Sequence, residues 1–187
     1  MKRIAIFASG SGTNAGNIIR YFKDNPGIEV SLVLSNKTDA YVLKRAEKLN
    51  VPFETFDRKT FYKTEKIAGL LVEKKIDLIV LAGFLWLVPG YLLKRFPHRI
   101  INIHPALLPK YGGKGMYGMR VHETVLKAGE SQSGITIHYV NEKYDEGAVI
   151  FQAKCNVLPS DTPETLAQKI HRLEYEHFPK VIERLLV

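Results

Sequence analysis

The chain of 187 residues contains a single cysteine, Cys155, and this scarcity excludes two kinds of structure. One thiol cannot form an internal disulfide, and it cannot supply a zinc site built on several cysteines. Long apolar runs are also missing, since none reaches the roughly 18 residues that a membrane span needs. The N-terminal stretch "MKRIAIFASG" starts like a signal peptide but passes at once into "SGSGTN". We therefore expect a mature cytoplasmic protein with no membrane partner.

Positive charge is in excess but is not concentrated anywhere along the chain. The formal net charge is +8, from 27 Lys and Arg against 19 Asp and Glu. No run of four basic residues occurs, and no basic stripe is interleaved with aromatic side chains, as a nucleic-acid groove would require. The charge therefore indicates solvated faces and no nucleic-acid partner, while an anionic metabolite stays open as a ligand.

Short apolar runs alternate with segments of helical spacing along the first hundred residues. The expected strands cover residues 3–9, 28–36, 51–56, 76–84 and 99–104. The expected helices cover residues 14–25, 39–50, 60–75 and 89–96, with Asp39 as a cap and Pro89 in a first turn. This alternation predicts an α/β fold with an open, doubly wound, mostly parallel sheet.

The pattern changes after residue 105. The apolar runs 133–141 and 148–158 are too close for a crossover helix, so we expect an antiparallel C-terminal edge. Residues 162–186 predict a long C-terminal helix, begun by Asp161 or Thr162 and bent at Pro179. The chain has no repeat and no linker, which favours a single domain over residues 1–187.

A glycine-rich loop, "FASGSGTNAGN", joins the first strand to the first helix. Gly10, Gly12 and Ala15 fit the G-x-G-x-x-G/A pattern, whose glycines let the backbone approach an anion at a helix N-terminus. A dinucleotide site also needs an acidic residue at the end of the second strand, where this chain has Ser35 and Asn36. The loop therefore favours a phosphate monoester, although a tight turn that binds nothing has the same composition.

The strand "RIINIH" ends with Asn102 and His104, two residues apart and so on one face of the strand. An Asn amide can donate to an oxyanion, and a His can move a proton near neutral pH. Asp145 or Glu146, in the turn "YDEGA", could supply a carboxylate to His104. Taken alone, these residues also fit a purely structural explanation: Asn102 would cap the backbone, His104 would have all its hydrogen bonds satisfied within the protein, and the Asp-Glu-Gly segment would be an ordinary turn. His138 is expected beside the site as a strand residue.

Sequence patterns of several other chemistries are absent. The chain has no G-x-S-x-G elbow, no G-x-x-x-x-G-K-[ST] loop and no H-E-x-x-H helix. His171 and His177 do not share a helix face well, so we expect no metal site.

Together these motifs resemble the phosphoribosylglycinamide formyltransferase family, folate-dependent enzymes of purine biosynthesis. The resemblance runs through "IAIFASGSGTN", "LAGFLWLV", "INIHPALLPKYGGKGMYG", "HETVLKAGE" and "SGITIHYVNEKYDEGAVIFQ". It implies a Rossmann-like formyltransferase fold, with 10-formyltetrahydrofolate as co-substrate, 5-phosphoribosylglycinamide as acceptor and no metal. The resemblance is also compatible with a homodimer.

The resemblance implies a role for individual residues. Asn102, His104 and Asp145 match the catalytic trio, in which Asn102 and a protonated His104 stabilise a tetrahedral oxyanion and Asp145 tunes the His. The residues matching the ribonucleotide site are Gly12, Thr13, Asn14 and Glu174. The residues matching the folate site are Lys59, Leu85, Trp86, Leu87, Val88, Asn102, Asn141 and Tyr144. Residues 1–100 would form the phosphate-binding half, and residues 101–187 the catalytic and folate-binding half.

Other functions stay open at this level. Formyltetrahydrofolate deformylases and methionyl-tRNA formyltransferases resemble the chain in the same trio, but the former carry an extra regulatory domain and the latter a tRNA-binding extension. A nicotinamide-dependent reductase would explain the glycine loop alone. A non-catalytic nucleotide-binding module would bind phosphate without folate.

Overall fold

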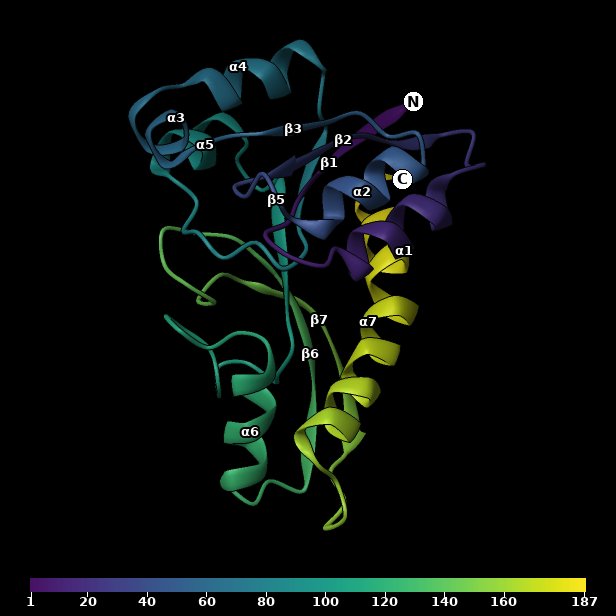
Figure 1. Cartoon of the computed structure of the whole chain (residues 1–187), viewed down its shortest axis with the longest axis vertical. Coiled ribbons are helices and arrows are strands. Elements are labelled where there is room, and N and C mark those ends of the chain that lie inside the picture. The colour runs from purple at the N-terminus through teal and green to yellow at the C-terminus, as the bar shows by residue number, and fades with distance from the viewer.

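A seven-stranded sheet forms the centre of the computed structural model, which describes all 187 residues (Figure 1). The strands are β1 Lys2–Phe7, β2 Ile28–Ser35, β3 Phe53–Thr55, β4 Leu78–Leu81, β5 Ile100–His104, β6 Gln132–Tyr139 and β7 Val149–Asn156. Their order is β3-β2-β1-β4-β5-β6-β7. Neighbours from β3 to β5 are parallel, whereas β6 and β7 join antiparallel. The predicted sheet is therefore confirmed, including its antiparallel edge.

Helices cover both faces of this sheet. They are α1 Thr13–Phe22, α2 Tyr41–Lys48, α3 Arg58–Lys63, α4 Lys66–Glu73, α5 Gly90–Arg95, α6 Met119–Lys127 and α7 Pro163–Leu186. One apolar core contains side chains of α1, α2, α6 and α7, and a second contains side chains of α3, α4 and α5. Along β4, Leu78 and Val80 enter the first core while Ile79 and Leu81 enter the second. A parallel strand covered on both faces must be apolar throughout, which explains the continuous run in the sequence.

Three local predictions were wrong. The expected helix 60–75 is two helices, because Thr64 is extended and its hydroxyl bonds the Thr60 carbonyl and the Lys66 amide. The cap of α2 is Ala40, which has no side chain able to cap, and not Asp39. Pro89 precedes α5 as its cap rather than entering its first turn. Helix α6 was not predicted at all.

The C-terminal helix α7 starts as expected. Thr162 is its cap and exchanges hydrogen bonds with Thr165 in a capping box, with Pro163 in the first turn. The helix continues through the buried Pro179 and lies along α1, where Asn17 donates to the Tyr175 carbonyl (Figure 1). Neither α7, at 24 residues, nor any other helix has the length and apolar composition needed to cross a bilayer. The fold thus brings the C-terminal helix beside the glycine loop.

Candidate active site

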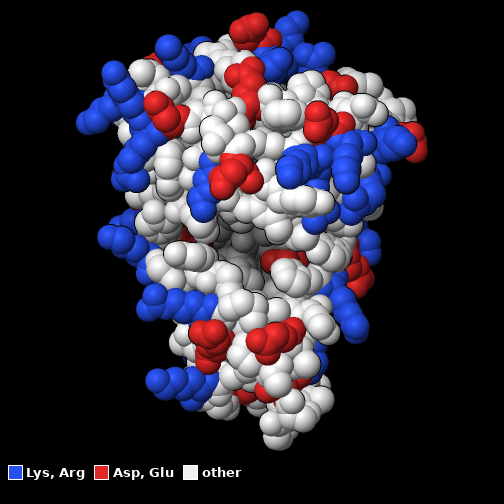
Figure 2. Space-filling model, viewed as in Figure 1, with Lys and Arg blue, Asp and Glu red and all other residues white.

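A cavity of about 730 Å³ opens beyond the carboxyl ends of β1, β4 and β5. Figure 2 shows it as a hollow near the middle of one face, with walls that carry few charged atoms. Its lining comes from segments far apart in the sequence: 9–14, 81–88, 102–105, 113–119 and 143–145, with further side chains from β6, α6 and α7. Parallel sheets place ligands at this edge, and the volume suits a small molecule.

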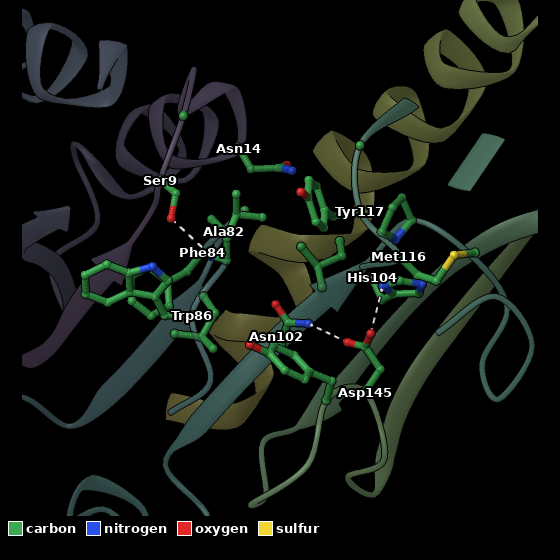
Figure 3. A pocket seen from close by; sticks show the side chains of 18 of the residues that line it. Ser9, Asn14, Ala82, Phe84, Trp86, Asn102, His104, Met116, Tyr117 and Asp145 are labelled. Carbon is green, nitrogen blue, oxygen red and sulfur yellow. Dashed lines mark hydrogen bonds and ion pairs between the residues drawn. The ribbon is translucent and has the colours of Figure 1, made fainter. Parts of the chain in front are cut away.

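The structure brings Asn102, His104 and Asp145 together in this cavity, as Figure 3 shows. His104 Nδ1 lies 3.5 Å from Asp145 Oδ2, and Asn102 Nδ2 lies 3.4 Å from Asp145 Oδ1. Asp145, in the turn between β6 and β7, has a positive φ of 57°. Of the two candidate carboxylates, Asp145 lines the cavity, whereas Glu146 is exposed and pairs with Lys143.

Burial dominates the ionisation of His104, whose side chain is 4% exposed. Burial lowers the pKa of His104, although the Asp145 carboxylate and the Tyr111 carbonyl both act to raise it. The expected effect of Asp145 is therefore present but outweighed, and the neutral ring is favoured in the free protein. Burial also acts to raise the pKa of Asp145, but His138, His104 and the Gly113 N–H together lower it below its usual range.

The hydrogen bond of His104 to the Tyr111 carbonyl fixes the tautomer of its ring. Nε2 lies 2.7 Å from the carbonyl oxygen of Tyr111. A carbonyl can only accept, so Nε2 carries the proton and the neutral ring has its lone pair on Nδ1. Nδ1 is the nitrogen beside Asp145, and it is therefore a proton acceptor next to an anion that would stabilise the added charge.

The glycine loop forms one end of the cavity. Gly12 precedes α1 in the left-handed conformation, with φ 68°, and no side chain caps the helix. The N–H groups of the first helical turn have no acceptor inside the helix and point toward the cavity end of α1. Lys37, after β2, lines the same region and adds positive charge. This geometry suits an anion, the kind of group that the resemblance implies for Gly12, Thr13 and Asn14.

Beside the loop, the buried Glu174 of α7 accepts hydrogen bonds from Asn14 and from His171, at 2.9 and 3.0 Å. The Glu174 hydrogen bond raises the pKa of His171. Two buried polar atoms here have no partner: Asn14 Oδ1 and Nδ1 of His122. Unpaired buried polar atoms cost free energy, so they indicate a ligand that pairs them.

The opposite wall of the cavity is apolar and aromatic. Trp86, shown beside Phe84 in Figure 3, lies among several rings, and the guanidinium of Arg58 is 5.6 Å from its ring centroid. The segment 85–88 is held at both sides, because Leu85 N–H donates to Ser9 Oγ and Leu87 C=O accepts from Tyr62. The N–H groups of Trp86, Leu87 and Val88 make no hydrogen bond within the chain. These backbone groups are free to bind a polar heterocycle.

Most of the residues predicted for the site line the cavity, but two do not. Lys59 is exposed on α3, outside the lining. Asn141 is exposed too, and its side chain accepts from the Lys143 N–H in a turn. Tyr144, in the same turn, does line the cavity. Among the described residues, no group of three or more His, Cys, Asp or Glu is placed to hold a metal ion.

Sequence reasoning missed several lining residues, namely Lys37, Lys114, His122, Lys143 and His171. His122 lies on the unpredicted helix α6, whose buried Val121 and Val125 are spaced by four residues and could have revealed the helix. His138 lies beside the site as expected, and also contacts Asn102 Nδ2 at 3.1 Å. Nothing in the sequence alone marks Lys37 or His171 as neighbours of the loop.

Comparisons with known proteins agree with this geometry. A family model described as formyl transferase matches residues 2–182. The phosphoribosylglycinamide formyltransferase of Haemophilus influenzae is 39% identical, over 98% of this chain and 86% of that protein. The chloroplastic phosphoribosylglycinamide formyltransferase of Arabidopsis thaliana is 37% identical, over 97% of this chain but only 64% of its own length. The crystal structure of phosphoribosylglycinamide formyltransferase from Bacillus halodurans matches with a TM-score of 0.88 and 40% identity, over 99% of this chain and 95% of that one.

Proposed function

The chain belongs to the formyl transferase family, and from this premise we propose that it transfers the formyl group of 10-formyltetrahydrofolate to the amine of 5-phosphoribosylglycinamide, a step of purine biosynthesis. One observation carries the proposal. Asn102, His104 and Asp145 meet in a cavity that has the glycine-rich loop and the uncapped N-terminus of α1 at one end and an aromatic wall at the other. Two different small molecules can thus meet at the trio.

The lining fits each substrate. The ribonucleotide phosphate would bind the N-terminus of α1 at Gly12, Thr13 and Asn14, with Lys37 nearby. Hydroxyl or amide groups of the same substrate would pair Glu174 and the unpaired atoms of Asn14 and His122. The folate ring would bind along Leu85, Trp86, Leu87 and Val88, with Tyr144 facing it and the free N–H groups of that segment as donors.

Bound 10-formyltetrahydrofolate supplies the formyl carbon. As the neutral amine nitrogen bonds to that carbon, the carbonyl electron pair moves to the formyl oxygen. Asn102 Nδ2 has one hydrogen on His138 and only a long contact to Asp145 for the other, so this second hydrogen is available to the oxyanion. His104 Nδ1 takes the proton that leaves the amine, Asp145 stabilises the imidazolium, and the imidazolium joins Asn102 in stabilising the oxyanion. The electron pair on the oxyanion then re-forms the C=O bond of the product, the bond from the formyl carbon to the folate nitrogen breaks, and the imidazolium returns its proton to that nitrogen.

The test is formyl transfer from 10-formyl-5,8-dideazafolate to 5-phosphoribosylglycinamide, followed by absorbance, with His104→Ala beside the parent. We expect turnover that needs both substrates, and a loss of about 100- to 1000-fold in the variant. Formate release without the ribonucleotide would establish a deformylase instead. Phosphate binding with no turnover and no folate binding would establish a nucleotide-binding module.

A further inference from the structure

Tyr111 has a backbone conformation that large side chains rarely adopt. Its φ is 58°, in the left-handed region, where a bulky residue is held only if its surroundings impose the conformation. Its carbonyl oxygen is the one that accepts from His104 Nε2, at 2.7 Å. The left-handed backbone of Tyr111 therefore directs its carbonyl oxygen at His104 Nε2, and this contact sets the tautomer of the ring.

The same short segment also supports Asp145. Two residues after Tyr111, the Gly113 N–H donates to Asp145 Oδ2 at 2.9 Å. Between them, a Cβ on Gly112 would lie 3.2 Å from the Asp145 Cβ and would overlap Leu108, so the segment passes very close to Asp145. Residues 111–113 thus contact both members of the His104–Asp145 pair, and their placement sets how the two side chains face each other.

What anchors this segment lies outside the cavity. Tyr111 Oη donates to Glu130 Oε1 at 2.7 Å, and Lys110 Nζ lies 2.8 Å from the same oxygen. Glu130 follows Gly129, which lies two residues beyond the last residue of α6 and has a φ of 67°. Neither Glu130 nor Tyr111 lines the cavity, so neither is placed to touch a substrate. The side chain of Glu130 is 27% exposed and that of Lys110 is 68% exposed, so the Tyr111 contact is the better shielded of the two.

We propose that Glu130 is a positioning residue for the formyl transfer: through the hydroxyl of Tyr111 it holds residues 111–113, and so fixes the orientation of His104 against Asp145. The inference rests on the proposed function for its kinetic consequence only. Its structural content, that the Glu130–Tyr111 bond controls the ring of His104, stands without any turnover.

The kinetic test compares Tyr111→Phe, Glu130→Ala and Glu130→Gln with the parent. Loss of the bond in the first two should lower kcat about 3- to 10-fold, while KM for both substrates changes less than about twofold. Glu130→Gln keeps an acceptor oxygen for the Tyr111 hydroxyl and should recover most of kcat. Lys110→Met should have little effect, and Glu176→Gln, in an exposed pair on α7, is the matched control. A raised KM with unchanged kcat, or Glu130→Gln as poor as Glu130→Ala, would overturn the proposal.

A second readout needs no activity. Nitrogen-15 NMR of the imidazoles reports the tautomer of His104, which should be protonated at Nε2 in the parent and in Glu130→Gln. In Tyr111→Phe and Glu130→Ala we expect a mixture of tautomers. If the parent shows no formyl transfer but the tautomer responds in this way, the proposed function fails and the positioning role stands. An unchanged tautomer in an active enzyme refutes the positioning role alone.

Discussion

The side-chain amide of Asn102 donates from Nδ2 to Nε2 of His138, 3.1 Å away on the neighbouring antiparallel strand. The donor is identified by the other ring nitrogen, because His138 Nδ1 lies 2.8 Å from the Tyr139 carbonyl oxygen and must carry the proton there. His138 is thus an acceptor at Nε2, and it holds the Asn102 amide with its nitrogen toward Asp145.

Replacing His138 should therefore impair Asn102 without removing it. In His138→Phe the ring is kept but the acceptor is lost, and we expect kcat to fall about 3- to 10-fold. Asn102→Ala should lose about 100- to 1000-fold. Adding His138→Phe to it should cost less than His138→Phe costs in the parent, because the part of its effect that passes through Asn102 is already lost, while the part that passes through Asp145, 3.6 Å from His138 Nε2, remains. His177→Phe, on α7 outside the cavity, is the control. Full additivity of the two changes would contradict this account.

The pH dependence of turnover should depend on Asp145. Protonation of His104 removes its acceptor, so kcat/KM should fall as the pH drops through the pKa of His104, which burial holds below the ordinary value of about 6.5. In Asp145→Asn the carboxylate that raises this pKa is gone, so the acid limb should move to lower pH while the plateau falls. Both proteins are assayed with the same substrates, so ionisation of the substrate amine affects the two pH profiles equally and does not contribute to the difference between them. An acid limb that moves to higher pH would rule out this role.

The single tryptophan should report folate binding. Trp86 lines the aromatic wall, whereas phosphate would bind at the other end of the cavity. Titration with 10-formyl-5,8-dideazafolate should change its fluorescence, and inorganic phosphate should not. Trp86→Ala should weaken folate binding about 10- to 100-fold, as expected for loss of a large buried apolar contact. If phosphate changes the Trp86 fluorescence and the folate analogue does not, the phosphate site lies at the aromatic wall and this assignment of the two ends is wrong.

The two loop glycines should differ sharply in their tolerance of alanine. A Cβ on Gly12 would overlap the Val42 side chain and lie 2.8 Å from its Cα, at a residue with φ 68°, whereas a Cβ on Gly10 would meet nothing within 4 Å. We expect Gly12→Ala to lower the free energy of unfolding by about 1 to 3 kcal/mol. The midpoint of thermal unfolding, measured by calorimetry, should fall by roughly 2 to 10 °C in Gly12→Ala. Gly10→Ala should unfold like the parent, and equal losses in both would refute the steric explanation.

Much of this architecture follows from local pattern. Strand β4 is apolar at every position because both faces are covered, and Asn102 and His104 share a face because strands alternate. Errors arose where one side chain overrode the helical pattern, as the Thr64 hydroxyl does between α3 and α4. Helix α6 was missed because the glycine-rich segment before it gives no start signal and its apolar spacing was not read as a helix.

The sequence by itself determined the strands and most of the helices, the glycine loop and the pair of polar residues at the end of β5, because each follows from a pattern of residues close along the chain. Local pattern left Asp145 and Glu146 equally open and only the resemblance named Asp145, whereas the tertiary structure gives the physical reason, since Asp145 is held in the cavity by Gly113, 32 residues away. The tertiary structure also brought Glu174 of α7 to Asn14 of α1, across 160 residues. Such contacts are set by how the helices pack on the sheet, which local periodicity does not encode.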